Sequence, residues 1–248
     1  MIDQTCFNNI LAQYKKDFPG KWWEGERFKW ECVKLFQDNW KIDTPDTDFP
    51  GMLKTCVQDK TDTLLSTPPY PADTIVKLAQ AAPGEVREMF RSLFDETQDA
   101  FIRIENFKKQ SDEMLKKYGD GKMSQPQDEH ASTSYLWLRY PDKYYMYKYS
   151  VGKAVSQALK SSYIFKAGAY RENLDNCVAL FDEIREFLSK DRELTEMLKN
   201  LLTDSCYPDP EYRTLTMDFG FYIEEKIIKK NSSKKMKLGG CLKVMIRD

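Results

Sequence analysis

The stretch PGEVREMFRSLFDETQDAFIRIENF, residues 83–107, decides the fold class. Its apolar side chains recur every three or four positions, which is the period of one helix face, while Glu and Arg fill the opposite face. Pro83 suits a first helical turn, because it lacks an N–H that would be unpaired there anyway. The pattern predicts helical structure as far as Gly119, either as one helix of roughly 50 Å at about 1.5 Å per residue or as two with a break at residues 96–99. The apolar positions are Val86, Met89, Phe90, Leu93, Phe94, Phe101, Ile104 and Phe107.

Similar apolar stripes lie on both sides of this stretch. Helical spacing recurs within residues 7–18, 28–40 and 52–65 before it, and within 151–159, 174–188 and 194–202 after it. The sequence therefore predicts a mainly α protein, a multi-helix domain.

Two stretches depart from the helical period. Tyrosines at 145, 147 and 149 alternate with Tyr144, Met146 and Lys148, and apolar side chains alternate with small or polar ones from Leu215 to Ile223. A period of two is typical of extended chain. The sequence predicts one or two short extended or β segments on the helical body.

The domain organisation follows from composition. Residues 119–129 are turn-rich and nearly devoid of core-forming side chains, which predicts a loop and a possible sub-boundary at 119–130. From Glu224 to Asp248 there are eight basic and three acidic residues. Because the whole chain carries −1 and this part +5, residues 1–223 carry −6. We expect a helical recognition-type domain over 1–223 and a basic tail or linker over 224–248.

The overall composition excludes several classes of protein. The chain of 248 residues has 14 Phe, 14 Tyr and 5 Trp, far too much large apolar surface for a disordered protein. Its net charge of −1 does not mark a basic nucleic-acid binder. Apolar runs are much shorter than the roughly 20 residues of a membrane span, and residues 1–5 do not resemble an export signal. We expect no membrane partner and a cytoplasmic location.

The residues needed for common catalytic motifs are missing. His130 is the only histidine, so paired-histidine metal sites are unavailable, and no GxSxG elbow is present. Residues 20–25 have the glycine spacing of a phosphate loop, but Glu26 and Arg27 stand where Lys and Ser or Thr are required. His130 itself is expected to be exposed or to cap a helix. The sequence predicts no catalytic residue, metal or cofactor.

The six cysteines form no CxxC pair, so reduced thiols are expected. Cys32, Cys56 and Cys177 fall on apolar stripes, where a free cysteine behaves as a small apolar side chain.

The most unusual composition is that of the tyrosine-rich segment, residues 135–149, with seven aromatic and three basic side chains. Aromatic rings stack on bases and basic side chains neutralise phosphates, so this combination is typical of a nucleic-acid interface. The same composition can form a core ledge with bonded tyrosine hydroxyls. As an interface it would use Arg139, Lys143 and Lys148 on phosphates and Trp137, Tyr144, Tyr145 and Tyr147 for stacking, provided that these side chains face outward.

Two further stretches combine suggestive residue types. Residues 22–30 are aromatic and basic, but Trp23 and Trp30 fall on one helix face, which favours core packing. Asp209, Glu224 and Lys226 resemble the Asp and Glu-x-Lys set with which nucleases hold magnesium and stabilise developing charge. With 77 charged residues in the chain, such a combination also arises by chance.

Four separated motifs resemble the N-terminal region of McrB-type, methylcytosine-specific restriction proteins of the AAA family. They are FKWECVKLFQDNW (residues 28–40), VREMFRSLFDE (86–96), YLWLRYPDKYYMYKYS (135–150) and LTDSCYPDPE (202–211). The resemblance covers roughly residues 1–223. It implies a target-recognition region that works with a nucleotide-hydrolysing motor and a separate nuclease subunit. It assigns no catalytic residue, and the motor's phosphate loop is missing here.

Three functions remain open from the sequence. The first is a non-catalytic DNA-recognition or accessory module of a restriction or phage-defence system, binding modified or unmodified DNA and partnering AAA motor and nuclease subunits. The second is a protein-interaction scaffold for such a motor or nuclease, which the −6 body favours. The third is a magnesium-dependent nuclease.

Overall fold

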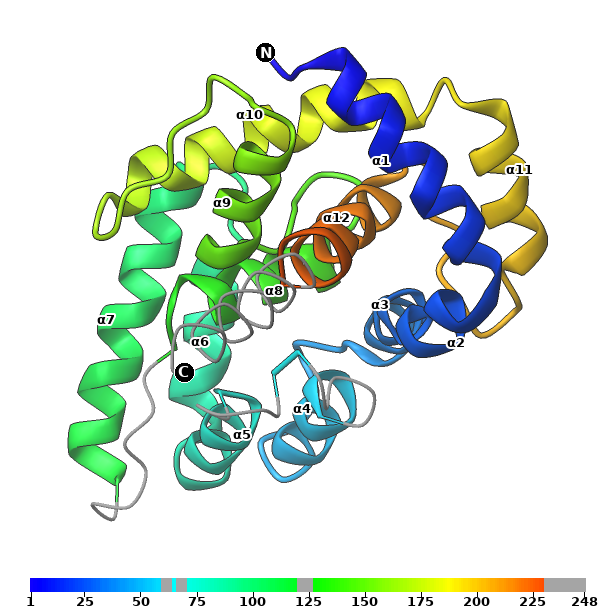
Figure 1. Cartoon of the computed structure of the whole chain (residues 1–248). Helices are drawn as coiled ribbons and strands as arrows, with labels where there is room; N and C mark the ends of the chain where they lie inside the picture. The colour runs from blue at the N-terminus through cyan, green and yellow to red at the C-terminus, as the bar shows by residue number, and fades with distance from the viewer. Residues whose placement is uncertain (59–63, 66–70, 120–126, 230–248) are drawn as a thin grey trace, which may run out of the picture.

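The computed structural model describes residues 1–58, 64–65, 71–119 and 127–229, and this part of the chain is mainly helical and contains no strand (Figure 1). Short π-helical turns are labelled η. The elements in chain order are α1 (Gln4–Asp17), η1 (Phe18–Trp22), α2 (Trp23–Glu26), α3 (Phe28–Asn39), α4 (Phe49–Val57), α5 (Pro71–Ala81), α6 (Pro83–Leu93), α7 (Ala100–Tyr118), α8 (Glu129–Arg139), α9 (Tyr149–Ala158), α10 (Tyr170–Leu188), α11 (Arg192–Leu201), α12 (Arg213–Tyr222) and η2 (Ile223–Lys229).

Helices α8 and α12 form the centre of the molecule. Nearly every side chain of each is buried, including the polar ones. Helices α3 and α7 pack against α8, while α9 and α10 pack against α12 (Figure 1). Most of the other helices have the one-sided apolar stripes that the sequence predicts, because each packs one face against neighbouring helices and meets solvent with the other.

The long helical stretch from Pro83 is divided in two. Helix α6 ends at Leu93, and α7 begins after Asp99, whose carboxylate accepts a hydrogen bond from the Ile102 N–H at 3.2 Å. The buried Arg103 guanidinium holds the corner by donating to the carbonyl oxygens of Leu93 (2.6 Å) and Gln98 (3.1 Å). The predicted alternative of a break at residues 96–99 is confirmed.

The prediction of an extended segment from Leu215 to Ile223 is wrong. These residues form α12 and the start of η2. The helix is buried on all sides, so no polar face imposes a period of 3.6 on its sequence. Its start is fixed by Asp209, whose carboxylate accepts hydrogen bonds from the N–H groups of Thr214 (3.1 Å) and Leu215 (2.8 Å).

The other alternating stretch is irregular chain. Residues 144–148 are not helical, and Lys148 has extended dihedral angles, but no strand pairs with them in the described part of the chain. The Tyr147 N–H instead donates to Thr133 Oγ1 at 2.9 Å, on α8. A side chain of the central helix thus takes the place of a partner strand.

The expected tail and loop can be compared with the structure only in part. The π-helical turn η2 continues α12 beyond residue 223 and packs on α9, so the first residues of the expected tail belong to the helical body. Residues 120–126 of the expected loop and 230–248 of the tail lie outside the described residues. Among the helices that the structure describes, none is both long and apolar enough to cross a bilayer.

Candidate functional site

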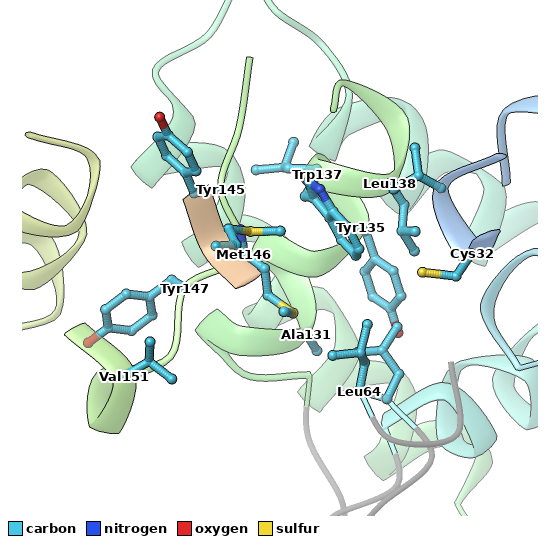
Figure 2. Packing of buried hydrophobic residues seen from close by; sticks show 14 of the residues in the cluster. Cys32, Leu64, Ala131, Tyr135, Trp137, Leu138, Tyr145, Met146, Tyr147 and Val151 are labelled. Carbon is cyan, nitrogen blue, oxygen red and sulfur yellow. The ribbon is translucent and has the colours of Figure 1, made fainter. Parts of the chain in front are cut away.

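The aromatic side chains of the tyrosine-rich segment are mostly inside the protein. The exposed fraction is 0% for Trp137, 4% for Tyr145 and 5% for Tyr147, and Tyr135 is also fully buried. Figure 2 shows Tyr135 and Trp137 among core residues such as Leu138 and Cys32. The predicted stacking role of Trp137, Tyr145 and Tyr147 therefore needs correction, because their ring faces already pack against other side chains.

The polar atoms of these buried aromatics are also used internally. Trp137 Nε1 donates to Thr214 Oγ1 at 3.2 Å, and the Tyr145 hydroxyl donates to Asp182 Oδ1 at 2.8 Å. Buried polar groups that find partners in this way stabilise the core. This is the core-ledge interpretation that the composition also allowed.

The remaining predicted contact residues of the segment differ in their exposure and in whether they form ion pairs. Lys143 is exposed but forms an ion pair with Glu96, and the half-buried Tyr144 donates its hydroxyl hydrogen to the same carboxylate. Arg139 is half-buried, and its guanidinium carbon lies 4.9 Å from the Tyr140 ring centroid. Lys148 is exposed and has no ion pair among the described residues.

The C-terminal end of the segment opens into a pocket of about 570 Å³, which we call the Tyr147 pocket. Its walls come from the start of α8, from residues 147–150, from the chain before α10 and from the end of α12. They are formed by Leu64, Pro71, Asp128, Glu129, His130, Tyr147, Lys148, Tyr149, Ser150, Ala167, Gly168, Tyr170, Asn173 and Phe221.

The charges around the Tyr147 pocket leave a basic side chain available. Both acidic residues of the wall are engaged: Glu129 pairs with Lys108, and Asp128 accepts the Ala131 N–H at 2.9 Å as the cap of α8. Lys148 Nζ lies 5.6 Å from the Phe221 ring centroid, at the pocket wall. Burial raises the pKa of Tyr147 to about 12, so its hydroxyl stays neutral at physiological pH. The pocket therefore offers the neutral hydroxyl of Tyr147 and a lysine without an ion pair among the described residues.

His130 has a structural position at this pocket. It is the second residue of α8 and half-buried, rather than exposed or capping. Its Nδ1 lies 2.8 Å from the Tyr147 carbonyl oxygen and its Nε2 lies 3.3 Å from the Leu64 carbonyl oxygen. Both ring nitrogens thus face backbone acceptors, and the ring joins three segments of the wall.

The nuclease-like set does not form one site. Asp209 caps the start of α12, whereas Glu224 lies beyond the end of the same helix, about 15 Å away at about 1.5 Å per residue. Lys226 pairs with Glu225 at 2.6 Å. No cluster of metal-ligating side chains occurs within the described ranges. Asp209 and Glu224 are too far apart to share a magnesium ion.

Residues 22–30 contribute to a cluster of buried polar side chains that sequence reasoning missed. We call it the Asp218 cluster, and its members are Tyr14, Trp22, Glu26, Lys29 and Asp218. Lys29 Nζ lies 2.6 Å from Asp218 Oδ1 and 2.7 Å from Glu26 Oε2. Asp218 Oδ2 accepts hydrogen bonds from the Tyr14 hydroxyl (2.6 Å) and from Trp22 Nε1 (2.8 Å). Burial lowers the pKa of Lys29, but the two carboxylates outweigh it and hold the pKa above its usual value. The predicted core packing is confirmed here, with ring centroids of Trp23 and Trp30 4.9 Å apart.

The cysteines behave as the stripes predict. Cys32 and Cys177 are buried and, like Cys6 and Cys206, are free thiols, and Cys56 is buried as well. Burial raises the pKa of Cys177 to about 12, which keeps this thiol protonated and unreactive. Cys241 lies outside the described residues.

Comparison with protein-family models, curated proteins and solved structures found no match. The resemblance to the N-terminal region of McrB-type proteins therefore stays a prediction from the four motifs.

Proposed function

We propose that this chain is a non-catalytic DNA-recognition module of a restriction or phage-defence system, with its DNA contact at the Tyr147 pocket. The observation that carries the proposal is Lys148, which forms no ion pair with the described residues and lies beside the rings of Tyr149, Tyr170 and Phe221 on the pocket wall. The sequence located the contact along the whole of residues 135–149, and the proposal narrows it to the last three residues of that range. Cations beside rings are the chemistry with which proteins hold phosphates and bases.

A salt series tests the proposal. DNA affinity falls with salt in proportion to the number of phosphates neutralised, with a slope of about −0.9 for each contact on duplex DNA. We expect Lys148→Ala to reduce this slope by about one contact. Lys143→Ala should leave it unchanged, because Glu96 already neutralises Lys143. Gel shifts with methylated, unmodified and single-stranded DNA at several salt concentrations measure both slopes, and equal slopes for the two variants would contradict the proposal.

A protein-docking function is the second candidate, and two observations favour it. The rings of Trp137 and Tyr145 are buried, and residues 1–223 carry a net charge of −6, which repels DNA. A docking part would show no DNA affinity even at low salt. It would instead form a stable complex with an AAA motor or nuclease subunit of such a system, measurable by titration calorimetry with the purified proteins.

A further inference from the structure

The size of the Tyr147 pocket limits what part of DNA can enter it. A volume of about 570 Å³ lies within the range of pockets for small organic ligands. Stacked base pairs of a duplex cannot fit inside such a volume, because both strands and their sugars would have to enter together. The pocket is therefore matched to a ligand of about the size of one nucleotide.

The aromatic wall suits a flat ligand. Tyr170 is exposed and lies on the pocket wall, and Phe221 is half-buried on another side of it. The hydroxyl groups of Tyr149 and Tyr170 form no hydrogen bond with other described residues, so both can donate to a ligand or accept from one. Lys108 Nζ lies 5.0 Å from the Tyr170 ring centroid and Lys153 Nζ lies 5.8 Å from that of Tyr149, so a base would stack on the opposite face of either ring and bond to its hydroxyl.

The cations around the pocket suit one phosphate group. Lys148 lies on the wall, and Lys153 Nζ lies 5.8 Å from the ring centroid of Tyr149, another wall residue. Neither lysine forms an ion pair with the described residues. The first turn of α9 starts at the same wall without a side-chain cap, and its N–H groups add partial positive charge to that of the lysines.

We propose that the Tyr147 pocket binds one unpaired nucleotide of single-stranded DNA, with its base against the tyrosine and phenylalanine rings and its phosphate at Lys148. This inference rests on the proposed DNA-recognition function and names the part of the DNA that the pocket takes. It predicts that the protein prefers a single strand to the duplex of the same sequence.

Two variants separate the pocket from general DNA affinity. Lys148→Ala removes the cation, and Ala167→Trp fills the pocket from an exposed position on its wall, where the new side chain does not disturb the core. Lys143→Ala is the matched control, because it removes a lysine of the same segment that lies outside the pocket wall. Circular dichroism and thermal melting of each variant check that the fold is kept.

The experiment measures fluorescence anisotropy of a labelled 12-nucleotide single strand and of its duplex with the full chain. We expect the single strand to bind about tenfold more tightly than the duplex. Each pocket variant should weaken single-strand binding about tenfold, the loss typical of one charge-assisted contact or one stacked base, and the control should change it less than twofold. As a competitor, thymidine 5′-monophosphate should displace the strand about tenfold better than thymidine.

The outcomes distinguish the inference from the function on which it rests. If single strand and duplex bind equally, and Ala167→Trp binds both as the wild type does, the pocket inference is overturned, and DNA recognition stands with its contact at another surface. If no DNA binds at low salt, the DNA-recognition function itself fails. Equal competition by thymidine and its monophosphate would overturn the phosphate position at Lys148.

Discussion

The Asp218 cluster and the Tyr147 pocket are built from the same residue types and are close neighbours. Each combines a lysine with several aromatic rings. One ring even serves both, because the Phe221 centroid lies 4.5 Å from Lys29 Nζ and 5.6 Å from Lys148 Nζ. Their surroundings differ. Lys29 is 1% exposed and forms ion pairs with two carboxylates, whereas Lys148 is exposed and forms an ion pair with none of the described ones.

This difference shows that the hydrogen-bond and ion-pair partners of the polar side chains, rather than the amino-acid composition, distinguish a core cluster from a binding surface. In the Asp218 cluster the lysine and the aspartate satisfy one another, and Tyr14 and Trp22 supply the remaining hydrogen bonds. Nothing is left for a ligand, so the cluster contributes to stability alone. In the Tyr147 pocket Lys148 has no ion-pair partner, and the hydroxyls of Tyr149 and Tyr170 have no hydrogen-bond partner, within the described ranges, so the same chemistry is available to a ligand.

The largest expected effect comes from breaking the Asp218 cluster. Lys29→Met keeps the apolar stem but leaves the fully buried Asp218 without its cation, and removing one partner of a buried ion pair costs about 3–5 kcal/mol. Lys34→Met is the control, because Lys34 and Asp38 form an exposed pair of the kind that contributes about 0.5 kcal/mol or less. Urea unfolding of both variants measures the difference. Equal losses of unfolding free energy in the two variants would show that the Asp218 cluster adds no more stability than the exposed pair.

The buried carboxylate of Asp209, which lacks a lysine partner, tests what Lys29 contributes to the stability of the Asp218 cluster. Asp209 accepts hydrogen bonds from Trp30, Thr214 and Leu215, but no cation pairs with it in the described part of the chain. Burial raises the pKa of Asp209 from 3.8 to about 7. Because the folded state favours the protonated acid, this stabilisation is complete below about pH 4 and is lost as the pH rises to about 7.

The corresponding variant is Asp209→Asn, which cannot ionise. The stability advantage of the wild type over this variant should shrink between pH 4 and pH 7, by up to about 4 kcal/mol for a shift of about three pKa units. Urea unfolding of both proteins at intervals of half a pH unit measures it. A difference that does not change with pH would show that Asp209 titrates at its ordinary pKa.

The buried end of the tyrosine-rich segment gives a smaller effect. Tyr145→Phe removes a hydroxyl that donates to Asp182 Oδ1 at 2.8 Å, and such a hydrogen bond contributes about 1 kcal/mol. Tyr170→Phe removes a hydroxyl at the open end that has no partner among the described residues, and its stability should be unchanged. Thermal unfolding of the two variants compares them, and a larger loss for Tyr170→Phe would contradict the assignment of the two ends.

Much of the fold could be predicted, because most helices pack one face against their neighbours and expose the other. The stripe from Val86 to Phe107 and the core position of Trp23 and Trp30 are seen in the structure as the spacing predicts. The prediction failed for α12, which is buried on all sides and so lacks a polar face. Its start depends on Asp209, and nothing in the local sequence shows that this carboxylate accepts hydrogen bonds from the N–H groups of Thr214 and Leu215.

The candidate site could be predicted only in part, for the same reason. Composition selected residues 135–149, and two of the seven predicted contact residues, Tyr147 and Lys148, line the pocket. The other walls come from Leu64, Tyr170 and Phe221, which are far apart in the sequence and meet only through the packing of α8, α9, α10 and α12. The Asp218 cluster was missed because Lys29 and Asp218 are 189 positions apart.

The smallest expected effect on stability separates binding from folding at the pocket. Lys148→Ala removes a cation that pairs with no described carboxylate, so the free energy of unfolding should change by less than about 0.5 kcal/mol. Lys143→Ala breaks the surface pair with Glu96 and should cost up to about 1 kcal/mol. The order of the two variants in stability is thus the reverse of their order in DNA affinity, where Lys148→Ala has the larger effect. If Lys148→Ala is instead the less stable of the two, Lys148 supports the fold as Lys29 does, and the pocket has no free cation for a phosphate.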